Sequence, residues 1–132
     1  MSARAEINEL LARYAWAYDE EDPEALASCF AENAEFDYGT ELLRGRDAIC
    51  GRLNGNRAAA RERGEQPRHV MTNVVVDEKG DGTARVLSYL SFTVSSASGT
   101  AVVLTATYDD VVVRDGGEWR FQRRAVNRDG GM

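Results

Sequence analysis

Residues 101–127, AVVLTATYDDVVVRDGGEWRFQRRAVN, indicate the class of fold more clearly than any other part of the chain. Two runs rich in valine, threonine and aromatic residues flank Asp115-Gly116-Gly117, and glycines at such a junction favour hairpin geometry. Upstream, residues 70–77 and 83–95 also read as strands, and glycine-containing turns again separate the runs. Strands joined by hairpins predict an antiparallel sheet in the second half of the chain.

The first half of the chain has the periodicity of helices instead. Apolar and aromatic side chains form one stripe of an amphipathic helix, with Ser2 as its N-cap and the acidic run 19–22 at its end. The stripe consists of Ile7, Leu10, Leu11, Tyr14 and Tyr18. Asp22-Pro23 then predicts the start of a second helix, because aspartate is a preferred N-cap and proline fits the first helical position.

A short strand and a third helix complete the predicted elements. Residues 34–38 are expected to form the strand, with 42–44 as its return partner. The third helix is expected from residue 46 towards residue 63. A break is predicted within residues 51–55, because the glycines and the asparagine there are poor helix formers.

This order of elements predicts an α+β fold, because helices that precede an antiparallel sheet pack on one of its faces. We expect a cone-shaped, curved antiparallel sheet that the N-terminal helices cover around an apolar pocket. The 132 residues fit a single domain spanning 1–132. An apolar pocket with a few polar groups suits a small hydrophobic substrate.

The composition argues against several kinds of partner. A net charge of −6 is unfavourable for binding nucleic acid, which needs a basic face. No apolar run approaches the roughly 18 residues of a membrane helix. The first residues lack the apolar core of a secretion signal, so we expect a cytoplasmic protein. A single histidine, with Cys29 and Cys50 outside any CxxC spacing, predicts buried free thiols and no metal site.

The side chains suited to acid–base chemistry are few. His69 opens a predicted strand, and imidazole is the group that exchanges protons near neutral pH. Asp19 ends the first helix, and Tyr14 lies on its apolar stripe, where a buried hydroxyl needs a partner. Strand alternation places Tyr38 on the face opposite Asp37. A structural interpretation stands beside each: a surface histidine, a solvated aspartate and a core tyrosine.

The last strand contributes one more candidate. Trp119, Phe121 and Arg123 share one face by alternation, and the apolar character of that face predicts an inward Arg123. A buried cation needs a counter-charge. This can be an anionic substrate or a structural acid such as Asp109 or Asp110.

Three segments resemble the SnoaL-like proteins of the nuclear-transport-factor-like superfamily. They are LLARYAWAYDEEDPEALASCFAENAEF (10–36), RHVMTNVVVD (68–77) and YDDVVVRDGGEWRF (108–121). The resemblance covers nearly the whole chain in order and implies an α+β cone and a homodimer. Members of the superfamily include isomerases, dehydratases, cyclases and non-catalytic binders, so the fold alone leaves the activity open.

One implied constellation is similar to that of the dehydratase and dehydrochlorinase branch. Those enzymes use an aspartate at the end of the first helix to orient a histidine at the start of a later strand, and Asp19 and His69 stand at these places. The bile-acid dehydratase also has tyrosines at the positions that Tyr14 and Tyr38 match. The resemblance thus implies a lyase whose general base is His69, oriented by Asp19, with both tyrosines on substrate oxygen. Scytalone dehydratase has a further histidine that this chain lacks.

The alternative constellation is similar to that of ketosteroid isomerase, in which a tyrosine and a neutral aspartic acid stabilise the enolate and a second aspartate is the base. Tyr14, Asp37 and Asp109 lie near those positions. We favour the first constellation, because an isomerase of this kind does not need the Asp19 and His69 pair. A non-catalytic ligand-binding domain is a third interpretation. No cofactor is predicted, since the chain has neither a P-loop nor a GxGxxG motif; the expected substrate is a polyketide, steroid or similar ring compound.

Overall fold

Three helices precede or interrupt the strands of a six-stranded sheet in the computed structural model, which describes residues 2–130. The helices are α1 (Ala3–Asp19), α2 (Pro23–Ser28) and α3 (Arg46–Glu62). The strands are β1 (Phe30–Asp37), β2 (Leu42–Arg44), β3 (Gln66–Glu78), β4 (Thr83–Ser96), β5 (Gly99–Asp115) and β6 (Glu118–Arg128). The α+β class and the order of elements agree with the prediction from the sequence.

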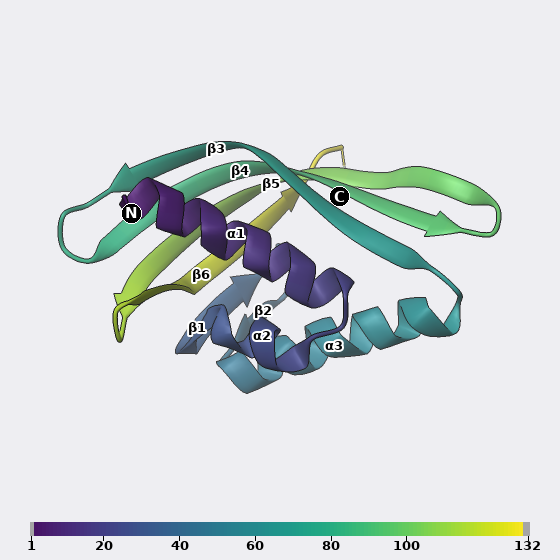
Figure 1. The fold of residues 1–132 in the computed structure, drawn as a ribbon, viewed down its shortest axis with the longest axis horizontal. Coiled ribbons are helices and arrows are strands. Elements are labelled where there is room, and N and C mark those ends of the chain that lie inside the picture. The colour runs from purple at the N-terminus through teal and green to yellow at the C-terminus, as the bar shows by residue number, and fades with distance from the viewer. Residues whose placement is uncertain (1, 131–132) are drawn as a thin grey trace.

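The sheet is curved and mixed, with the strand order β2-β1-β6-β5-β4-β3. Figure 1 shows the long strands β3, β4 and β5 arching over α1, while β1, α2 and α3 lie beneath them. All neighbouring strands are antiparallel except β1 and β6, which run parallel. The prediction of a wholly antiparallel sheet was therefore wrong at this junction. Hairpins force antiparallel pairing only between consecutive strands, and most of the chain separates β1 from β6.

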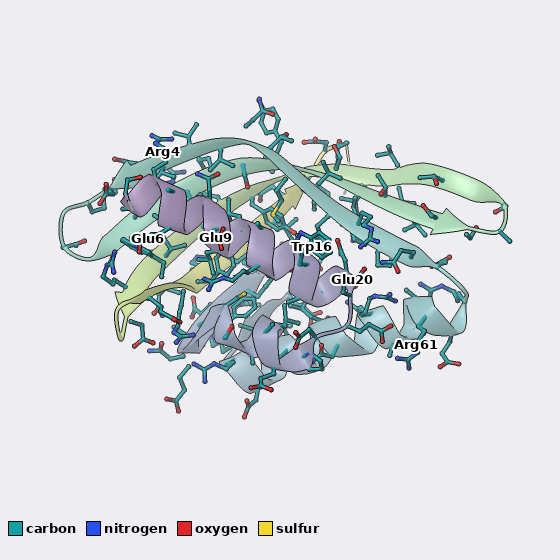
Figure 2. The ribbon with its side chains drawn as sticks, viewed as in Figure 1. Arg4, Glu6, Glu9, Trp16, Glu20 and Arg61 are labelled. Atoms are coloured by element: carbon teal, nitrogen blue, oxygen red, sulfur yellow. The ribbon has the colours of Figure 1, made fainter. Side chains whose placement is uncertain are left out.

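Helices α1 and α2 begin where the sequence predicts. The Ser2 hydroxyl accepts the backbone N–H of Ala5 at 3.2 Å, and the Asp22 carboxylate accepts that of Ala25 at 3.1 Å. The predicted stripe of α1 is buried against the sheet. Its opposite face carries charged side chains and Trp16, which is 67% exposed (Figure 2). The last residue of α1, Asp19, is buried as well.

Helix α3 runs without the predicted break. Its buried side chains recur at helical spacing on the face that packs inward, and they are Ile49, Cys50, Leu53, Arg57 and Ala60. Gly51 and Gly55 lie in open space on the other side. Each glycine costs about 1 kcal/mol relative to alanine in a helix interior. Burial of the inward face offsets this cost, since a fully buried leucine or isoleucine contributes roughly 1.5–3 kcal/mol.

The core lies between the concave face of the sheet and the helices. Its centre is aromatic, with Phe30, Phe36 and Phe121 almost fully buried. The ring of Phe30 contacts those of Phe36, Phe121 and Tyr14, and Tyr14 also contacts Phe121. Cys29 and Cys50 are buried free thiols, as predicted. This packing fills the narrow end of the cone and leaves the wide end hollow.

Candidate active site

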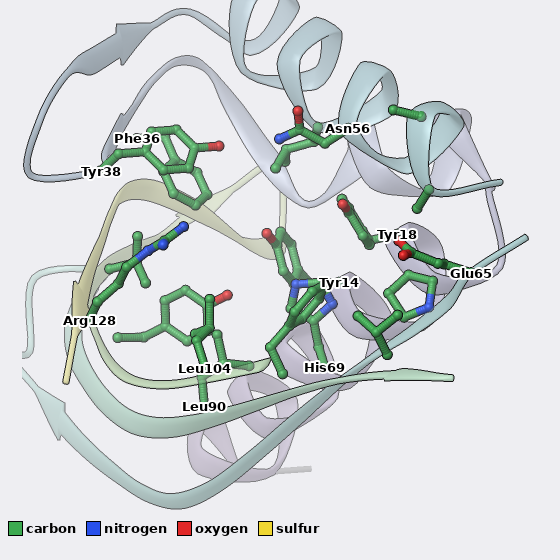
Figure 3. A pocket seen from close by; sticks show the side chains of 18 of the residues that line it. Tyr14, Tyr18, Phe36, Tyr38, Asn56, Glu65, His69, Leu90, Leu104 and Arg128 are labelled. Carbon is green, nitrogen blue, oxygen red and sulfur yellow. The ribbon is translucent and has the colours of Figure 1, made fainter. Parts of the chain in front are cut away.

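A cavity of about 320 Å³ occupies the hollow end of the cone (Figure 3). Helices α1 and α3, the end of β1 and strands β3 to β6 all contribute to its wall. Its apolar lining includes Phe36, Leu53, Leu90, Phe92, Val94, Leu104 and Val126. Its polar lining includes Tyr14, Tyr18, Tyr38, Asn56, Arg63, Glu65, His69, Tyr108 and Arg128. We call this space the central cavity.

Asp19 and His69 are in direct contact at the wall of the central cavity. The ring Nδ1 of His69 lies 2.8 Å from Asp19 Oδ1, and the backbone N–H of His69 donates to Asp19 Oδ2 at 2.9 Å. The side chain of His69 is only 7% exposed, and that of Asp19 is only 5% exposed. A carboxylate can only accept, so the proton of the neutral ring is on Nδ1. Nε2 is left with a lone pair that can accept a proton.

The end of α1 is itself fixed from two sides. Arg57 Nε donates to the backbone carbonyl of Asp19 at 3.1 Å, and Gln66 Nε2 donates to the same oxygen at 3.0 Å. Arg57 comes from α3 and is almost fully buried, while Gln66 is the first residue of β3. These two donors hold the aspartate against the start of the strand that carries His69.

Aromatic rings enclose the imidazole on three sides. The ring of His69 makes edge-on contacts with Tyr18 at 4.7 Å, Phe92 at 4.8 Å and Tyr14 at 5.5 Å between ring centroids. Such packing restricts the rotation of the ring. It also shields the pair of Asp19 and His69 from water, which strengthens the electrostatic interaction between them.

The tyrosine hydroxyls at the cavity wall are protonated donors. Burial raises the pKa of Tyr18 to about 12, and burial also raises the pKa of Tyr38. Burial also raises the pKa of Tyr14 well above 10, although nearby Arg124 lowers it. The Tyr38 hydroxyl is buried and has no hydrogen-bond partner among the described residues. A ligand oxygen in the cavity can supply that partner.

A buried ion pair lies beneath these tyrosines, and sequence reasoning did not identify it. Arg124 donates to Asp110 through Nε at 3.0 Å and through the terminal nitrogen at 3.1 Å, and both side chains are fully buried. The guanidinium stacks on the rings of Tyr108 at 3.5 Å and Tyr14 at 4.5 Å. Burial raises the pKa of Asp110 to about 6, although Arg124 lowers it.

The inward orientation predicted for Arg123 was wrong. Val111 pairs with Arg123 but Val112 pairs with Phe121, so a β-bulge places one extra residue, Gln122, in β6. The extra residue shifts the alternation by one position. Trp119 and Phe121 face the core as predicted, but the next inward cation is Arg124. Arg123 is on the outer face and pairs with Asp37 at 2.9 Å.

Two predicted substrate-binding acids also lie outside the central cavity. Asp37 is engaged by Arg123 and accepts the backbone N–H of Gly39 at 2.7 Å. Asp109 forms a bidentate pair with Arg85 at 3.0 and 2.7 Å. The hydrogen bond from Arg85 lowers the pKa of Asp109, so its carboxyl is ionised near neutral pH. The structure therefore brings Tyr14, Tyr38 and His69 to the cavity wall, with Asp19 behind His69 and in contact with it, and it leaves Arg123, Asp37 and Asp109 outside.

The described residues contain no cluster of three or more histidine, cysteine, aspartate or glutamate side chains that could hold a metal ion. Among the helices that the structure describes, none is long and apolar enough to cross a membrane.

The helices, the curved sheet and the cavity between them define the class of nuclear-transport-factor-like folds. A protein described as ntf2-like with a cystatin-like fold, from Novosphingobium aromaticivorans, is 27% identical, with a TM-score of 0.86. The alignment covers 98% of this chain and 83% of that chain. Within this class the chain belongs to the SnoaL-like family, because the family model described as a SnoaL-like domain matches residues 1–125.

Two further solved structures are similar over nearly their whole length. Aln2 from a Streptomyces species is 35% identical, with a TM-score of 0.84 over 98% of this chain and 93% of that chain. A protein from Catenulispora acidiphila, solved in complex with S-DNPA, is 28% identical, with a TM-score of 0.83 over 96% and 92% of the two chains. No match was found among the curated proteins.

Proposed function

We propose that the protein is a cofactor-independent lyase in which His69 is the general base that acts on a small hydrophobic carbonyl compound. The observation that carries this proposal is the contact between Asp19 and His69 at the wall of an apolar cavity. A carboxylate on Nδ1 makes Nε2 the basic nitrogen and stabilises the imidazolium that forms. General-base catalysis of this kind contributes about 10²–10⁴ in rate.

The reaction is a dehydration of a β-hydroxy carbonyl compound. Nε2 of His69 removes the proton from the carbon next to the carbonyl, and the electron pair moves to the carbonyl oxygen as an enolate. The hydroxyls of Tyr14 and Tyr38 donate hydrogen bonds to substrate oxygen in a water-poor site. The enolate then re-forms the carbonyl and expels the β-hydroxyl, which takes the proton from the imidazolium and leaves as water. His69 returns to its neutral form.

The same enolate can lead to isomerisation or ring closure, so these activities use the same residues. The constellation of Tyr14, Asp37 and Asp109 receives no support from the geometry, because both aspartates are held in ion pairs outside the cavity. Support for a small organic ligand comes from the Catenulispora acidiphila relative, which was solved in complex with S-DNPA. A homodimer and a cytoplasmic location remain parts of this proposal.

Proton exchange tests the proposal before the natural substrate is known. Bicyclic β-hydroxy ketones are incubated with the protein in deuterated water, and NMR follows both deuterium at the α-carbon and formation of the conjugated ketone. We expect His69→Gln to reduce both rates by about 10²–10⁴. Tyr89→Phe is a matched control, because Tyr89 is 56% exposed and does not line the cavity. Equal rates in the wild type and His69→Gln would exclude His69 as the base. Tight binding without exchange would favour a non-catalytic binder.

A further inference from the structure

Strand β6 directs an arginine into the wide end of the central cavity. Arg128 pairs with Ala106 of β5, and Ala106 pairs with Leu90 of β4. Residues directly opposite each other on neighbouring strands share a face of the sheet. Ala106 and Leu90 are buried on the concave face, being 2% and 4% exposed. Arg128 therefore also points to the concave side, and Figure 3 shows its side chain reaching into the cavity from β6.

Arg128 differs from the other cations near this space because it has no carboxylate partner among residues 2–130. Arg63 on the cavity wall pairs with Glu65 at 3.0 Å, and Arg52 nearby is paired with Glu41. The acid next in sequence to Arg128, Asp129, accepts the Thr105 hydroxyl at 2.9 Å. The chain has six more acidic than basic side chains, yet none of those described neutralises Arg128. An anion in the cavity would meet one uncompensated positive charge.

The position of Arg128 defines the size of a ligand that would also reach His69. Strands β5 and β4 separate β6 from β3, which corresponds to about 14 Å across the strands. His69 lies two residues along β3 from Met71, the residue in register with Arg128. The concave surface between the two residues is apolar, with Leu90, Leu104 and Val126 in the cavity lining. A fused-ring compound with a short acidic arm can span this surface, and a single small ring cannot.

A second hollow, of about 700 Å³, adjoins the central cavity at Arg128. The two spaces share Tyr38, Asn56, Val126 and Arg128 in their lining. The guanidinium thus lies at the junction, where an anionic group can remain partly hydrated. Partial hydration lowers the cost of removing the charged group from water.

We propose that Arg128 is the binding site for a carboxylate on the substrate, so that the substrate is a hydrophobic ring acid held between Arg128 and His69. The assignment of the reacting end to His69 rests on the function proposed above. The planar fork of a guanidinium matches a carboxylate, and such charge-assisted pairs are about twice as strong as neutral hydrogen bonds. The carboxylate fixes the orientation of the ring on the apolar floor, with the reacting carbon towards Nε2.

Binding of a matched pair of probes tests this site without requiring turnover. Naphthoate and its neutral carboxamide have nearly the same shape and differ in charge, and titration calorimetry or naphthalene fluorescence gives both dissociation constants. We expect the wild type to bind naphthoate at least about tenfold more tightly than the carboxamide. Arg128→Gln should remove this preference by weakening naphthoate binding alone, and Arg128→Lys should retain part of it.

Two other variants test whether a loss of the preference for naphthoate is specific to Arg128. Arg44→Gln removes the same charge from a side chain that is 74% exposed and lines neither hollow, so it should keep the preference. His69→Gln should keep the preference too, while it slows proton exchange by about 10²–10⁴. Failure of the catalytic proposal would therefore leave this binding result unchanged. The carboxylate site is overturned if Arg128→Gln keeps the wild-type preference, or if the wild type binds both probes equally or binds neither at millimolar concentration.

Discussion

The carboxylate of Asp19 forms two hydrogen bonds with one residue. Oδ2 accepts the backbone N–H of His69, and Oδ1 lies 2.8 Å from its ring nitrogen Nδ1. The first bond holds the aspartate against the backbone of β3, so the second is made at a fixed angle. The protonation site of the imidazole therefore depends on the chemistry of a single side chain.

Asp19→Asn should move the proton of the neutral His69 ring from Nδ1 to Nε2. The amide oxygen has to accept the backbone N–H of His69, which turns the amide NH₂ towards Nδ1. Nδ1 must then accept, so the ring proton is placed on Nε2, which can no longer act as a base. Long-range ¹H–¹⁵N NMR of the neutral ring distinguishes the two tautomers, and the single histidine of the untagged chain makes the signal unambiguous. We expect activity to fall by about 10²–10⁴ in parallel.

Asp22→Asn is the matched control for this experiment. It makes the same chemical change in the same acidic run, but Asp22 caps α2 and does not contact His69. Its spectrum should show the wild-type tautomer. A tautomer that is the same in the wild type and in Asp19→Asn would contradict the assigned contact.

At the scale of the element, the sequence predicts what depends on local periodicity. The stripe of α1 places Tyr14 correctly, and the predicted end of that helix places Asp19. Strand β3 begins at Gln66, before the predicted strand, so His69 is its fourth residue and does not open it. The face of Arg123 could not be predicted, because the bulge at Gln122 arises from the pairing of β6 with β5 and has no signal in the alternating sequence. The parallel pairing of β1 with β6 is likewise non-local. The continuity of α3 depends on burial of Leu53 and its neighbours, which outweighs the helix propensity of glycine.

Because of the bulge, replacement of Arg124 and replacement of Arg123 should have very different effects on the free energy of unfolding. Arg124→Met leaves Asp110 buried without its partner, which should lower the free energy of unfolding by about 3–5 kcal/mol near pH 8. Arg123→Met removes a half-exposed pair with Asp37 and should cost about 1 kcal/mol or less. Urea denaturation of both variants measures the difference. A larger loss in Arg123→Met would mean that β6 alternates without a bulge.

The cost of Arg124→Met should also depend on pH. Burial raises the pKa of Asp110 from its ordinary 3.8 to about 6 in the folded protein, so the folded state favours the protonated carboxyl more than the unfolded state does. Removal of Arg124 takes away a positive charge that lowers this pKa, so the pKa should rise further. Protonation then relieves the unpaired charge as the pH falls, and the destabilisation should be smaller near pH 5 than near pH 8. Arg123→Met should lower the free energy of unfolding by the same small amount at both pH values.

At the scale of the whole molecule, the concave and convex faces of the sheet have different exposed chemistry. The concave face holds the central cavity. Its charged side chains are either paired, as Arg124 is with Asp110, or point into the cavity, as Arg128 does. The convex face carries an apolar group that we call the outer patch, composed of Val75, Leu87, Tyr89 and Val111, which are 37–56% exposed. Val75 pairs directly with Leu87, so part of the patch is continuous across β3 and β4. Contiguous exposed apolar surface of this kind is typical of association sites.

The family resemblance implies a homodimer. We predict that the outer patch forms its interface. The chain has a net charge of −6, so two copies repel each other unless they meet at a neutral surface. The charged side chains beside the patch are neutralised within one chain, with Arg85 bound to Asp109 and Arg123 to Asp37. A two-fold axis would place the patch of one copy on that of the other. Light scattering and sedimentation velocity should therefore show a dimer at micromolar concentrations.

Leu87→Lys should weaken this dimer by at least about tenfold, because each copy would bring an unpaired cation into the apolar contact. Leu42→Lys is the control, since Leu42 is exposed to the same extent, 39%, but lies on β2 at the other edge of the sheet. A wild-type monomer at these concentrations, or equal weakening by both variants, would exclude the outer patch as the interface. Because Leu87 faces away from the central cavity, the dissociated Leu87→Lys chain should still discriminate naphthoate from its carboxamide.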